Sequence, residues 1–226
     1  RIDEKKEGTW NKQIQIWKEA YSASYKSNGS LNPKYLMNKL FELTQGKSVI
    51  TTEVGQNQMW TAQYYPFTDP RTFISSGGLG TMGYGLGAAI GAAVGKPDCK
   101  VINIAGDGSF RMNLSELSTI SKYKLPIIQV VLNNSSLGMV RQWQKFFQGQ
   151  RYSHTSFSDE VCFAKLADAF GIRSAKITED AEVEKVFKEA LDTDEPVVIE
   201  CIIHPDDLVL PMVPAGEPIS ECIDDI

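Results

Sequence analysis

Along most of this chain, segments with the apolar spacing of a helix alternate with short apolar runs typical of strands. Residues 33–43 have the spacing of an amphipathic helix, and the segments after them contain short apolar runs rich in β-branched residues. Runs of that kind, bounded by turn residues, are typical of strands covered on both faces. The predicted strands are residues 49–51, 72–75, 101–105, 127–132, 172–177 and 197–203. The pattern therefore predicts an α/β fold, with a doubly wound, mainly parallel sheet and helices on both faces.

The same pattern divides the chain into three parts. Residues 1–30 are charged and helix-like and end in a Ser-Asn-Gly-Ser stretch typical of loops, so we expect a helical lead-in or linker. Residues 31–204 carry the α/β pattern and are expected to form the domain itself. Residues 205–226 contain four prolines, too many for regular structure, and are expected to form an extended tail or lid. Because the sequence does not begin with methionine, we expect a piece of a longer protein.

Composition and charge narrow the classes of function. The chain has 226 residues, of which 42% are hydrophobic, and 23 basic against 28 acidic residues give a net charge of −5. Such a chain can bury a core, and without a long basic block it is not expected to bind nucleic acid. Its four cysteines and two histidines show no metal-ligand spacing, which favours reduced thiols and a cytoplasmic location.

One uncharged segment raises the question of a membrane span. Residues 72–95 contain no charged side chain, but eight of these 24 residues are glycine. A buried glycine-rich turn and helix is therefore expected instead of a transmembrane helix, and no membrane partner is expected. Gly83, Gly87, Gly91 and Gly95 recur every four residues, which predicts a helix packed very close to the sheet or to a neighbour.

Two polar motifs follow two of the predicted strands. The sequence Gly-Asp-Gly centred on Asp107 follows the third strand, and an Asn-Asn pair ending at Asn134 follows the fourth. Carboxyl ends of parallel strands meet at one edge of an open sheet, where ligands bind. A carboxylate and a carboxamide at that edge could hold a hard cation such as Mg²⁺ against a diphosphate. Each motif alone is also explained by a turn or a helix cap, whereas the two together favour such a site.

The segment between the two motifs is expected to be helical. Asn113 and Glu116 have the spacing of a capping box, with asparagine as N-cap and glutamate at the third helical position. Pro126 limits the other end of this helix.

A second glycine motif offers an alternative kind of site. Gly78-x-Gly80-x-x-Gly83 follows an apolar run, and Asp98 lies twenty residues after its first glycine, which is the spacing of a dinucleotide fingerprint. Asp98 falls in a turn before the next predicted strand, however, and not at that strand's end where it would reach a ribose. A dinucleotide-binding domain stays open as the less favoured reading.

Longer strings resemble one enzyme family. They are residues 53–60 (EVGQNQMW), 76–83 (SGGLGTMG), 138–143 (GMVRQW) and 151–154 (RYSH). With the two polar motifs, they resemble the carboxyl-terminal, thiamine diphosphate-binding domain of the catalytic subunits of acetolactate synthase, also called acetohydroxyacid synthase. The resemblance runs from about residue 10 to residue 214 and implies the thiamine diphosphate-binding form of the α/β fold.

This resemblance implies roles for particular residues. Mg²⁺ would be bound by the side chains of Asp107 and Asn134 and by the backbone carbonyl of Ser136. Contacts to thiamine diphosphate would come from Gly55, Gln56, Asn57, Gly80, Met82, Gly106, Gly108, Ser109, Asn134 and Met139. A substrate channel would be lined by Met139, Val140 and Trp143.

Two positions depart from the family's pattern. Asn57 stands where histidine is common, so an amide that can donate a hydrogen bond replaces a side chain that can carry positive charge. Leu137 stands where a polar residue is frequent. The expected contact to the diphosphate is altered at the first of these positions.

The resemblance also implies a reaction. In this family the full enzyme joins pyruvate to a second 2-ketoacid, either pyruvate or 2-ketobutyrate, with loss of CO2, in branched-chain amino acid biosynthesis. FAD and the activating glutamate would belong to parts of the enzyme outside this chain, and Glu53 does not replace that glutamate. No catalytic residue is therefore expected here, and the isolated chain is expected to be inactive. A homodimer or higher homo-oligomer is implied, with a regulatory subunit as a further candidate partner.

Two other readings stay open. Pyruvate oxidases and 2-ketoacid decarboxylases share the Gly-Asp-Gly and Asn-Asn motifs, but they are not expected to share the Gln142-Trp143 segment or residues 151–154. A domain that serves assembly alone would bind no cofactor, and Asp107→Ala would then leave all ligand binding unchanged.

Overall fold

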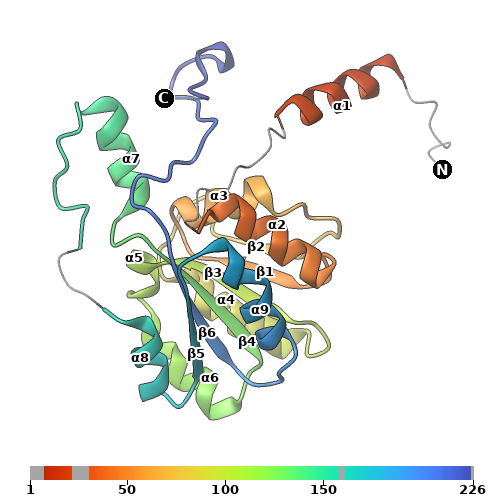
Figure 1. Cartoon of the computed structure of the whole chain (residues 1–226), viewed down its shortest axis with the longest axis vertical. Helices are drawn as coiled ribbons and strands as arrows, with labels where there is room; N and C mark the ends of the chain where they lie inside the picture. The colour runs from red at the N-terminus through yellow and green to blue at the C-terminus, as the bar shows by residue number, and fades with distance from the viewer. Residues whose placement is uncertain (1–7, 22–30, 158–160, 225–226) are drawn as a thin grey trace.

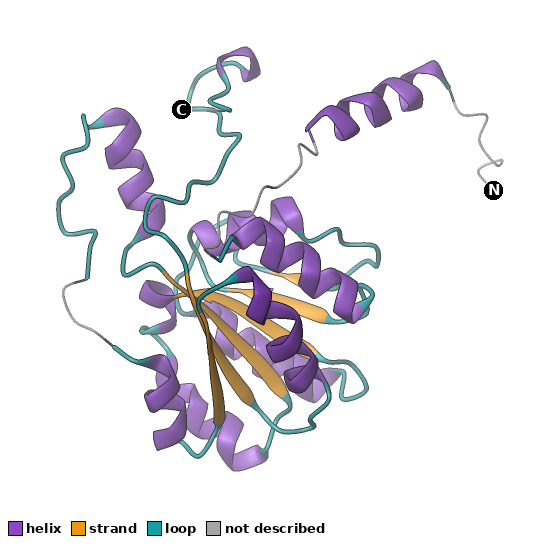
Figure 2. Ribbon diagram, in the orientation of Figure 1, coloured by secondary structure: helices purple, strands orange, loops and turns teal. Residues whose placement is uncertain are grey.

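The sheet of this protein has six parallel strands. The computed structural model describes residues 8–21, 31–157 and 161–224 (Figures 1 and 2). The strands are β1 Val49–Thr52, β2 Phe73–Ile74, β3 Val101–Gly106, β4 Ile127–Asn133, β5 Arg173–Ile177 and β6 Val197–Ile202. Their order across the sheet is β2-β1-β3-β4-β6-β5, and every neighbouring pair is parallel. Each predicted strand is confirmed to within one residue at either end.

Helices cover both faces of this sheet. One face carries α2 Pro33–Thr44, α3 Gln56–Tyr64 and α9 Asp180–Leu191, and the other carries α4 Tyr84–Gly95, α6 Leu117–Tyr123 and α8 Phe163–Ala169. The remaining α-helices are α1 Thr9–Tyr21, α5 Asp107–Phe110 and α7 Gly138–Phe147. Two short 3-10 helices are η1 Leu114–Glu116 and η2 Ile219–Glu221. The predicted doubly wound α/β fold is confirmed (Figure 2).

Alternate residues of the central strands point into two separate cores. On β3, Ile102 and Ile104 pack on the side of α2, α3 and α9, whereas Val101 and Ala105 pack on the side of α4, α6 and α8. Burying one such aliphatic side chain contributes roughly 1.5–3 kcal/mol. Because both faces are buried, each central strand is largely apolar, which explains the long apolar runs of the sequence.

A row of buried polar side chains crosses the centre of the sheet. Thr51 Oγ1 donates to Asn103 Oδ1 at 2.9 Å, and Asn103 Nδ2 donates to Gln129 Oε1 at 2.7 Å. Helix α4 lies directly over this row. A Cβ added to Gly85 would lie 2.6 Å from Asn103 Oδ1 and 2.6 Å from the backbone nitrogen of Glu53. Only glycine permits so close an approach between α4 and the sheet.

The glycine repeat does not make the expected contact with the sheet, and the alternative contact with a neighbour stays a prediction. A Cβ on Gly87, Gly91 or Gly95 would meet no heavy atom within 4 Å, so these glycines do not contact the sheet. A repeat of four residues advances about 400° around a helix, so its members share one face, and here that face points away from the sheet. Gly85 lies on the opposite face and makes the close contact.

The predicted capping box between the two polar motifs is wrong. Asn113 precedes η1, its side chain makes no capping bond, and its Nδ2 donates to the carbonyl of Gly83 at 3.2 Å. The α-helix begins only at Leu117, and Glu116 accepts from Thr119 Oγ1. A tertiary bond to the start of α4 has therefore replaced the local cap.

The two ends of the chain are expected to form a helical lead-in and an extended tail. Helix α1 lies within the predicted lead-in, and the loop predicted for residues 27–30 lies outside the described residues. After β6, the described residues 203–224 contain no α-helix or strand, and Met212 and Ile223 pair through two backbone hydrogen bonds of 2.8 Å. The division into lead-in, domain and tail stays a prediction.

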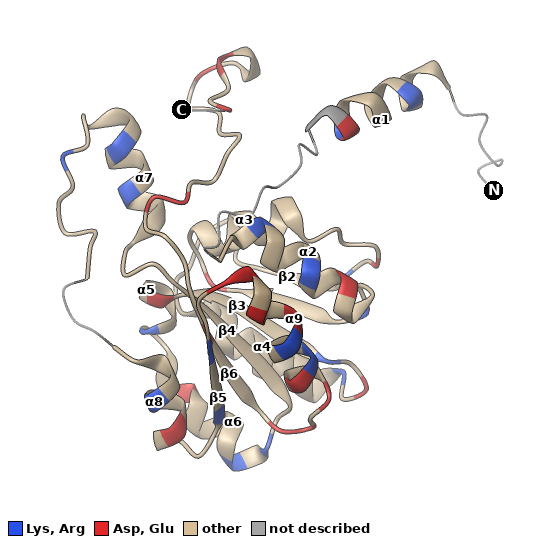
Figure 3. Cartoon of the chain, in the orientation of Figure 1, with Lys and Arg blue, Asp and Glu red and all other residues tan. Residues whose placement is uncertain are grey.

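The described helices are short, and their charges are mixed. None of them combines the length and the apolar character that crossing a membrane requires. Figure 3 shows basic and acidic residues interspersed along α2 and α9.

Candidate functional site

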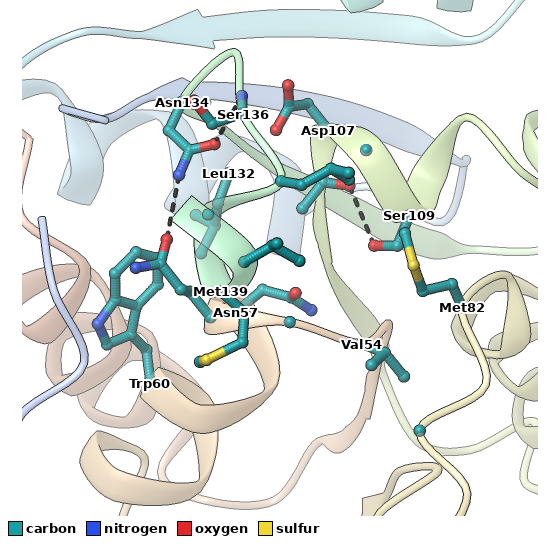
Figure 4. Close-up of a pocket in the computed structure, with 18 residues that line it drawn as sticks. Val54, Asn57, Trp60, Met82, Asp107, Ser109, Leu132, Asn134, Ser136 and Met139 are labelled. Atoms are coloured by element: carbon teal, nitrogen blue, oxygen red, sulfur yellow. Dashed lines mark hydrogen bonds between the residues drawn. The ribbon is translucent and has the colours of Figure 1, made fainter. Parts of the chain in front are cut away.

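A cavity of about 220 Å³ opens at the carboxyl edge of the central strands (Figure 4). Asp107 directly follows β3 and Asn134 directly follows β4, and these strands pair with Gly106 opposite Leu132. The lining residues are Val54, Gly55, Gln56, Asn57, Trp60, Gly80, Met82, Gly106, Asp107, Gly108, Ser109, Leu132, Asn134, Ser136, Leu137, Gly138, Met139 and Val140. Apart from Trp143, every residue predicted to contact cation, cofactor or substrate lies here.

The Asp107 carboxylate is the most unusual polar group in this cavity. The residue is 1% exposed, and neither carboxylate oxygen accepts a hydrogen bond from the described part of the chain. Burial raises the pKa of this carboxyl to about 7, while the Arg111 guanidinium and nearby backbone N–H groups offset only part of the rise. Those N–H groups act through their dipoles from outside hydrogen-bonding geometry. A buried carboxylate without a partner is costly unless a cation neutralises it.

Two further oxygen donors of the predicted cation site lie in the turn after β4. Asn134 Oδ1 accepts from the backbone N–H of Ser136 at 3.1 Å, and Asn134 Nδ2 donates to Gln56 Oε1 at 3.1 Å. Ser135, which lies between Asn134 and Ser136 in the chain, has a left-handed backbone with φ 52°. Figure 4 shows the amide oxygen of Asn134 on the side of Asp107 and its nitrogen turned away. One carboxylate with amide and carbonyl oxygens is a donor set that suits Mg²⁺.

Other kinds of metal centre find no support in the described residues, where no three His, Cys, Asp or Glu side chains come together as potential ligands. The four cysteines are all free.

Two helix N-termini face the cavity without a side-chain cap. Helix α3 starts after Gly55, whose φ of 133° favours glycine, and α7 starts after Leu137. Uncapped N-terminal N–H groups and the helix dipole favour an anion such as a diphosphate. At Gly108 a Cβ would lie 2.8 Å from Leu137 Cδ2, so glycine also keeps this wall of the cavity clear.

Asn57, the residue that replaces a common histidine, is buried and held by the sheet. Its Nδ2 donates to the carbonyl of Ile104 at 2.9 Å. Its Oδ1 lies 3.4 Å from the position of a Cβ on Gly106. The amide is thus anchored to β3 while its residue lines the cavity.

Glu53 joins two walls of the cavity without lining it. Its carboxylate is fully buried and accepts from the backbone N–H groups of Gly83 at 2.7 Å and Leu86 at 3.2 Å. Burial raises the pKa of this carboxyl, and the N–H groups at the start of α4 oppose the rise. The loop that carries Gly80 and Met82 is thereby fixed against the end of β1. That Glu53 is not the activating glutamate stays a prediction.

The three predicted channel residues fall into two groups. Met139 and Val140 line the cavity, and Val140 is also 49% exposed. Trp143 lies outside the lining, is 41% exposed and packs against Phe147 with ring centroids 5.0 Å apart. The structure therefore brings the first two to the site and leaves Trp143 on the exposed side of α7.

Sequence reasoning assigned no site role to five lining residues, namely Val54, Trp60, Leu132, Leu137 and Gly138. Trp60 lies one helical turn after Gln56, so the spacing of α3 could have revealed it. Gly138 gave a weaker signal, as a single glycine at the start of the string of residues 138–143.

The rival dinucleotide fingerprint does not assemble. Gly80 lines the cavity, but Asp98 is exposed in the turn between α4 and β3. That turn precedes β3, so Asp98 lies at the amino edge of the sheet, whereas the cavity lies at the carboxyl edge. An acidic residue placed there cannot bind the ribose of a nucleotide held in the cavity.

Comparisons with known proteins agree with this geometry. Residues 53–201 match the family model described as thiamine pyrophosphate enzyme, C-terminal TPP binding domain. The chain is 42% identical over 224 residues to the chloroplastic acetolactate synthase of Arabidopsis thaliana, covering 96% of this chain and 33% of that protein. It is 46% identical over 192 residues to a probable acetolactate synthase large subunit of Methanococcus aeolicus, covering 84% and 32%. An acetolactate synthase large subunit of Lactococcus lactis is 42% identical over 215 residues, covering 95% and 37%.

The chain thus spans about a third of the length of these relatives. The family model covers the region from Glu53, at the end of β1, to Cys201 in β6, which contains the whole cavity lining. This chain belongs to the family of thiamine pyrophosphate enzyme C-terminal TPP-binding domains.

Proposed function

We propose that the cavity binds Mg²⁺ and, through it, the diphosphate of thiamine diphosphate. The single observation that carries this proposal is the buried, unpartnered carboxylate of Asp107 beside the amide oxygen of Asn134. The cation would be held by Asp107, by Asn134 Oδ1 and by the backbone carbonyl of Ser136. When bound, thiamine diphosphate supplies an electron sink for decarboxylation and carbon–carbon bond formation.

The remaining lining residues have positioning roles in this proposal. The uncapped starts of α3 and α7 and the glycines at 55, 106 and 108 surround the diphosphate, with Gln56, Asn57 and Ser109 beside them. Gly80, Met82 and Met139 surround the rest of the cofactor, and the apolar Met82 side chain holds it in place by packing. This arrangement excludes water and fixes geometry before reaction.

For the complete protein we propose the activity of acetolactate synthase. The names of the relatives support it, because proteins from a plant, an archaeon and a bacterium that match most of this chain all carry that name. The substrates would be pyruvate and a second 2-ketoacid, in a cytoplasmic homodimer or larger homo-oligomer to which a regulatory subunit could bind. FAD and the activating glutamate would be supplied from outside this chain, so the chain alone would turn over little substrate.

Two assays test the two levels of this proposal. The isolated chain is titrated with thiamine diphosphate and with NAD, each with and without Mg²⁺; binding of NAD in preference would favour the dinucleotide reading. The complete protein is incubated with pyruvate, and its products are identified. Acetolactate is expected, whereas acetaldehyde would indicate a decarboxylase and peroxide formation an oxidase. Robust acetolactate formation by the isolated chain would contradict the proposal that it is only half of the active site.

A further inference from the structure

A chain of side-chain amides links the cation site to the segment that follows β6. Gln56 Nε2 donates to Gln142 Oε1 at 3.1 Å and to the carbonyl of Asp207 at 2.9 Å. Gln142 is in turn bonded to Val209, whose N–H donates to Oε1 and whose carbonyl accepts from Nε2, both at 2.9 Å. The other end of Gln56 accepts from Asn134 Nδ2. All three side-chain amides are buried.

The direction of each amide is fixed by the backbone of Val209. A backbone N–H only donates and a backbone carbonyl only accepts, so the two bonds from Val209 leave one orientation for the Gln142 amide. Gln142 Oε1 then requires the nitrogen of Gln56, and Gln56 Oε1 requires the nitrogen of Asn134. The Asn134 oxygen is consequently turned away from Gln56 and toward Asp107 (Figure 4).

Gly138 gives independent support for this arrangement. A Cβ at this position would lie 1.9 Å from Gln56 Oε1 and 2.7 Å from Asn134 Nδ2. The bond between Gln56 and Asn134 therefore passes directly over the first residue of α7, and only glycine leaves room for it. The chain has a residue without a side chain at the one place where a side chain would break the link.

We propose that Gln56 is a positioning residue that orients Asn134 Oδ1 toward the cation. Through Gln56 and Gln142, the position of residues 207–209 is coupled to occupancy of the cation site. This inference rests on the proposed Mg²⁺ and thiamine diphosphate site and extends it to the segment after β6. Further bonds seat the same segment, since Trp60 Nε1 donates to the carbonyl of Leu208 and Tyr64 Oη to that of Leu210, both at 3.3 Å. Side chains of α3 and α7 thus bond to each of residues 207–210.

The coupling has two consequences that can be measured separately. Loss of the Gln56 amide leaves the Asn134 amide oriented by the Ser136 N–H alone. The apparent affinity for Mg²⁺ then falls, by about 10–100-fold if Gln56 acts like other residues that orient metal ligands. Coupling between two sites is reciprocal, so binding of Mg²⁺ and thiamine diphosphate should slow hydrogen exchange at the Val209 amide. In a variant without the link, this exchange should no longer respond to the ligands.

The test uses the whole 226-residue chain and four variants. Gln56→Leu keeps most of the side-chain volume and removes every bond of the amide. Gln142→Leu removes the bonds to Val209 and to Gln56 but leaves the bond between Gln56 and Asn134 in place. Gly138→Ala displaces the Gln56 side chain without altering it, and serves if Gln56→Leu fails to fold. Gln58→Leu is the control, because Gln58 lies on the same helix but donates to Ser75 Oγ outside the cavity. Circular dichroism verifies that each variant is folded.

Mg²⁺ affinity at fixed thiamine diphosphate and hydrogen exchange at Val209 are then measured. Gln56→Leu and Gly138→Ala should weaken Mg²⁺ binding about 10–100-fold, and their affinity for thiamine diphosphate should recover at saturating Mg²⁺. A merely structural defect would instead lower the affinity for Mg²⁺ and also the affinity for thiamine diphosphate at saturating Mg²⁺. Gln142→Leu should speed exchange at Val209, and Gln58→Leu should match the wild type. The inference would be overturned if Gln56→Leu bound Mg²⁺ as tightly as the wild type. It would also be overturned if hydrogen exchange at Val209 in the wild type did not change when Mg²⁺ and thiamine diphosphate bind. A wild type that shows no Mg²⁺-dependent binding would overturn the proposed function and the inference with it.

Discussion

The carboxylate of Glu53 accepts the backbone N–H of Gly83 at 2.7 Å, and this bond ties the end of β1 to the start of α4. Both segments contribute to the cavity, because Val54 follows Glu53 and Met82 precedes Gly83. A residue that makes no contact with the cavity therefore holds two of its walls together.

Glu53→Gln should destabilise the protein and loosen the cofactor site. The N–H groups of Gly83 and Leu86 donate to different oxygens of the carboxylate, and in the amide one of these two positions becomes an NH2 group that faces an N–H and cannot accept from it. We expect the free energy of unfolding to fall by about 1–3 kcal/mol in urea denaturation, together with weaker binding of thiamine diphosphate. Glu189→Gln, on the exposed side of α9, is the matched control. Unchanged stability of Glu53→Gln would show that the carboxylate contributes nothing to this junction.

The metal-free chain should lose stability as the pH rises toward neutrality. The pKa of Asp107 is about 7 in the folded chain, against 3.8 for an ordinary aspartate, so between these values the folded state holds a proton that the unfolded state releases. Its contribution to the free energy of unfolding therefore falls as the pH increases, by about 1.4 kcal/mol for each unit of difference in pKa.

Asp107→Asn should remove that slope, and its measurement needs only denaturant unfolding in EDTA. The variant should match the wild type near pH 4 and exceed it in stability at about pH 8, where the wild-type carboxylate is charged and buried. Added Mg²⁺ should raise the stability of the wild type alone. The same stability difference between the two proteins at every pH would contradict the burial argument for Asp107.

Two glycine-to-alanine substitutions should act in opposite directions. At Gly108 a Cβ would lie 2.8 Å from Leu137 Cδ2 and 3.1 Å from Phe157 Cζ, so Gly108→Ala should cost about 1–3 kcal/mol of stability. At Gly87, within α4, a Cβ meets nothing within 4 Å, and alanine should stabilise the helix by roughly 0.5–1 kcal/mol. Thermal unfolding of the two variants measures both effects. Destabilisation by Gly87→Ala would indicate that this face of α4 is covered in solution.

Met82 and Trp143 should separate cofactor binding from the exposed side of α7. Met82 lines the cavity, so Met82→Ala should weaken binding of thiamine diphosphate by about tenfold or more. Trp143 lies outside the lining, so Trp143→Ala should leave that affinity unchanged. Calorimetric titration of both variants compares them directly. Equal losses in the two variants would show that the cavity extends along α7 to Trp143.

The strands and the position of the site could be predicted because they depend on local pattern. Runs such as 101–105 and 127–132 are apolar except for one polar residue each, and the polar residues after them necessarily meet at one edge of a parallel sheet. The cap predicted at Asn113 failed because a tertiary bond to Gly83 competed with the local one. The sequence pattern alone could not show whether the Asn113 side chain caps the next helix or bonds to Gly83.

The amide chain behind the cation site was out of reach for a different reason. Gln56 and Asn134 are 78 positions apart, and Gln56 and Asp207 are 151 apart. Glutamine is common on helix surfaces, and only the fold shows that this one is buried and bonded at both ends. The role of Gly138 is similarly visible only once the Gln56 side chain is seen to cross it.

The central claim is that Asp107 binds the cation that recruits thiamine diphosphate. Calorimetric titration of the wild-type chain and of Asp107→Asn with thiamine diphosphate, at saturating Mg²⁺ and again in EDTA, tests this claim most directly. We predict binding by the wild type only when Mg²⁺ is present, and its loss in Asp107→Asn although the variant stays folded. Binding of equal strength by both proteins, or binding that does not depend on Mg²⁺, would contradict the account.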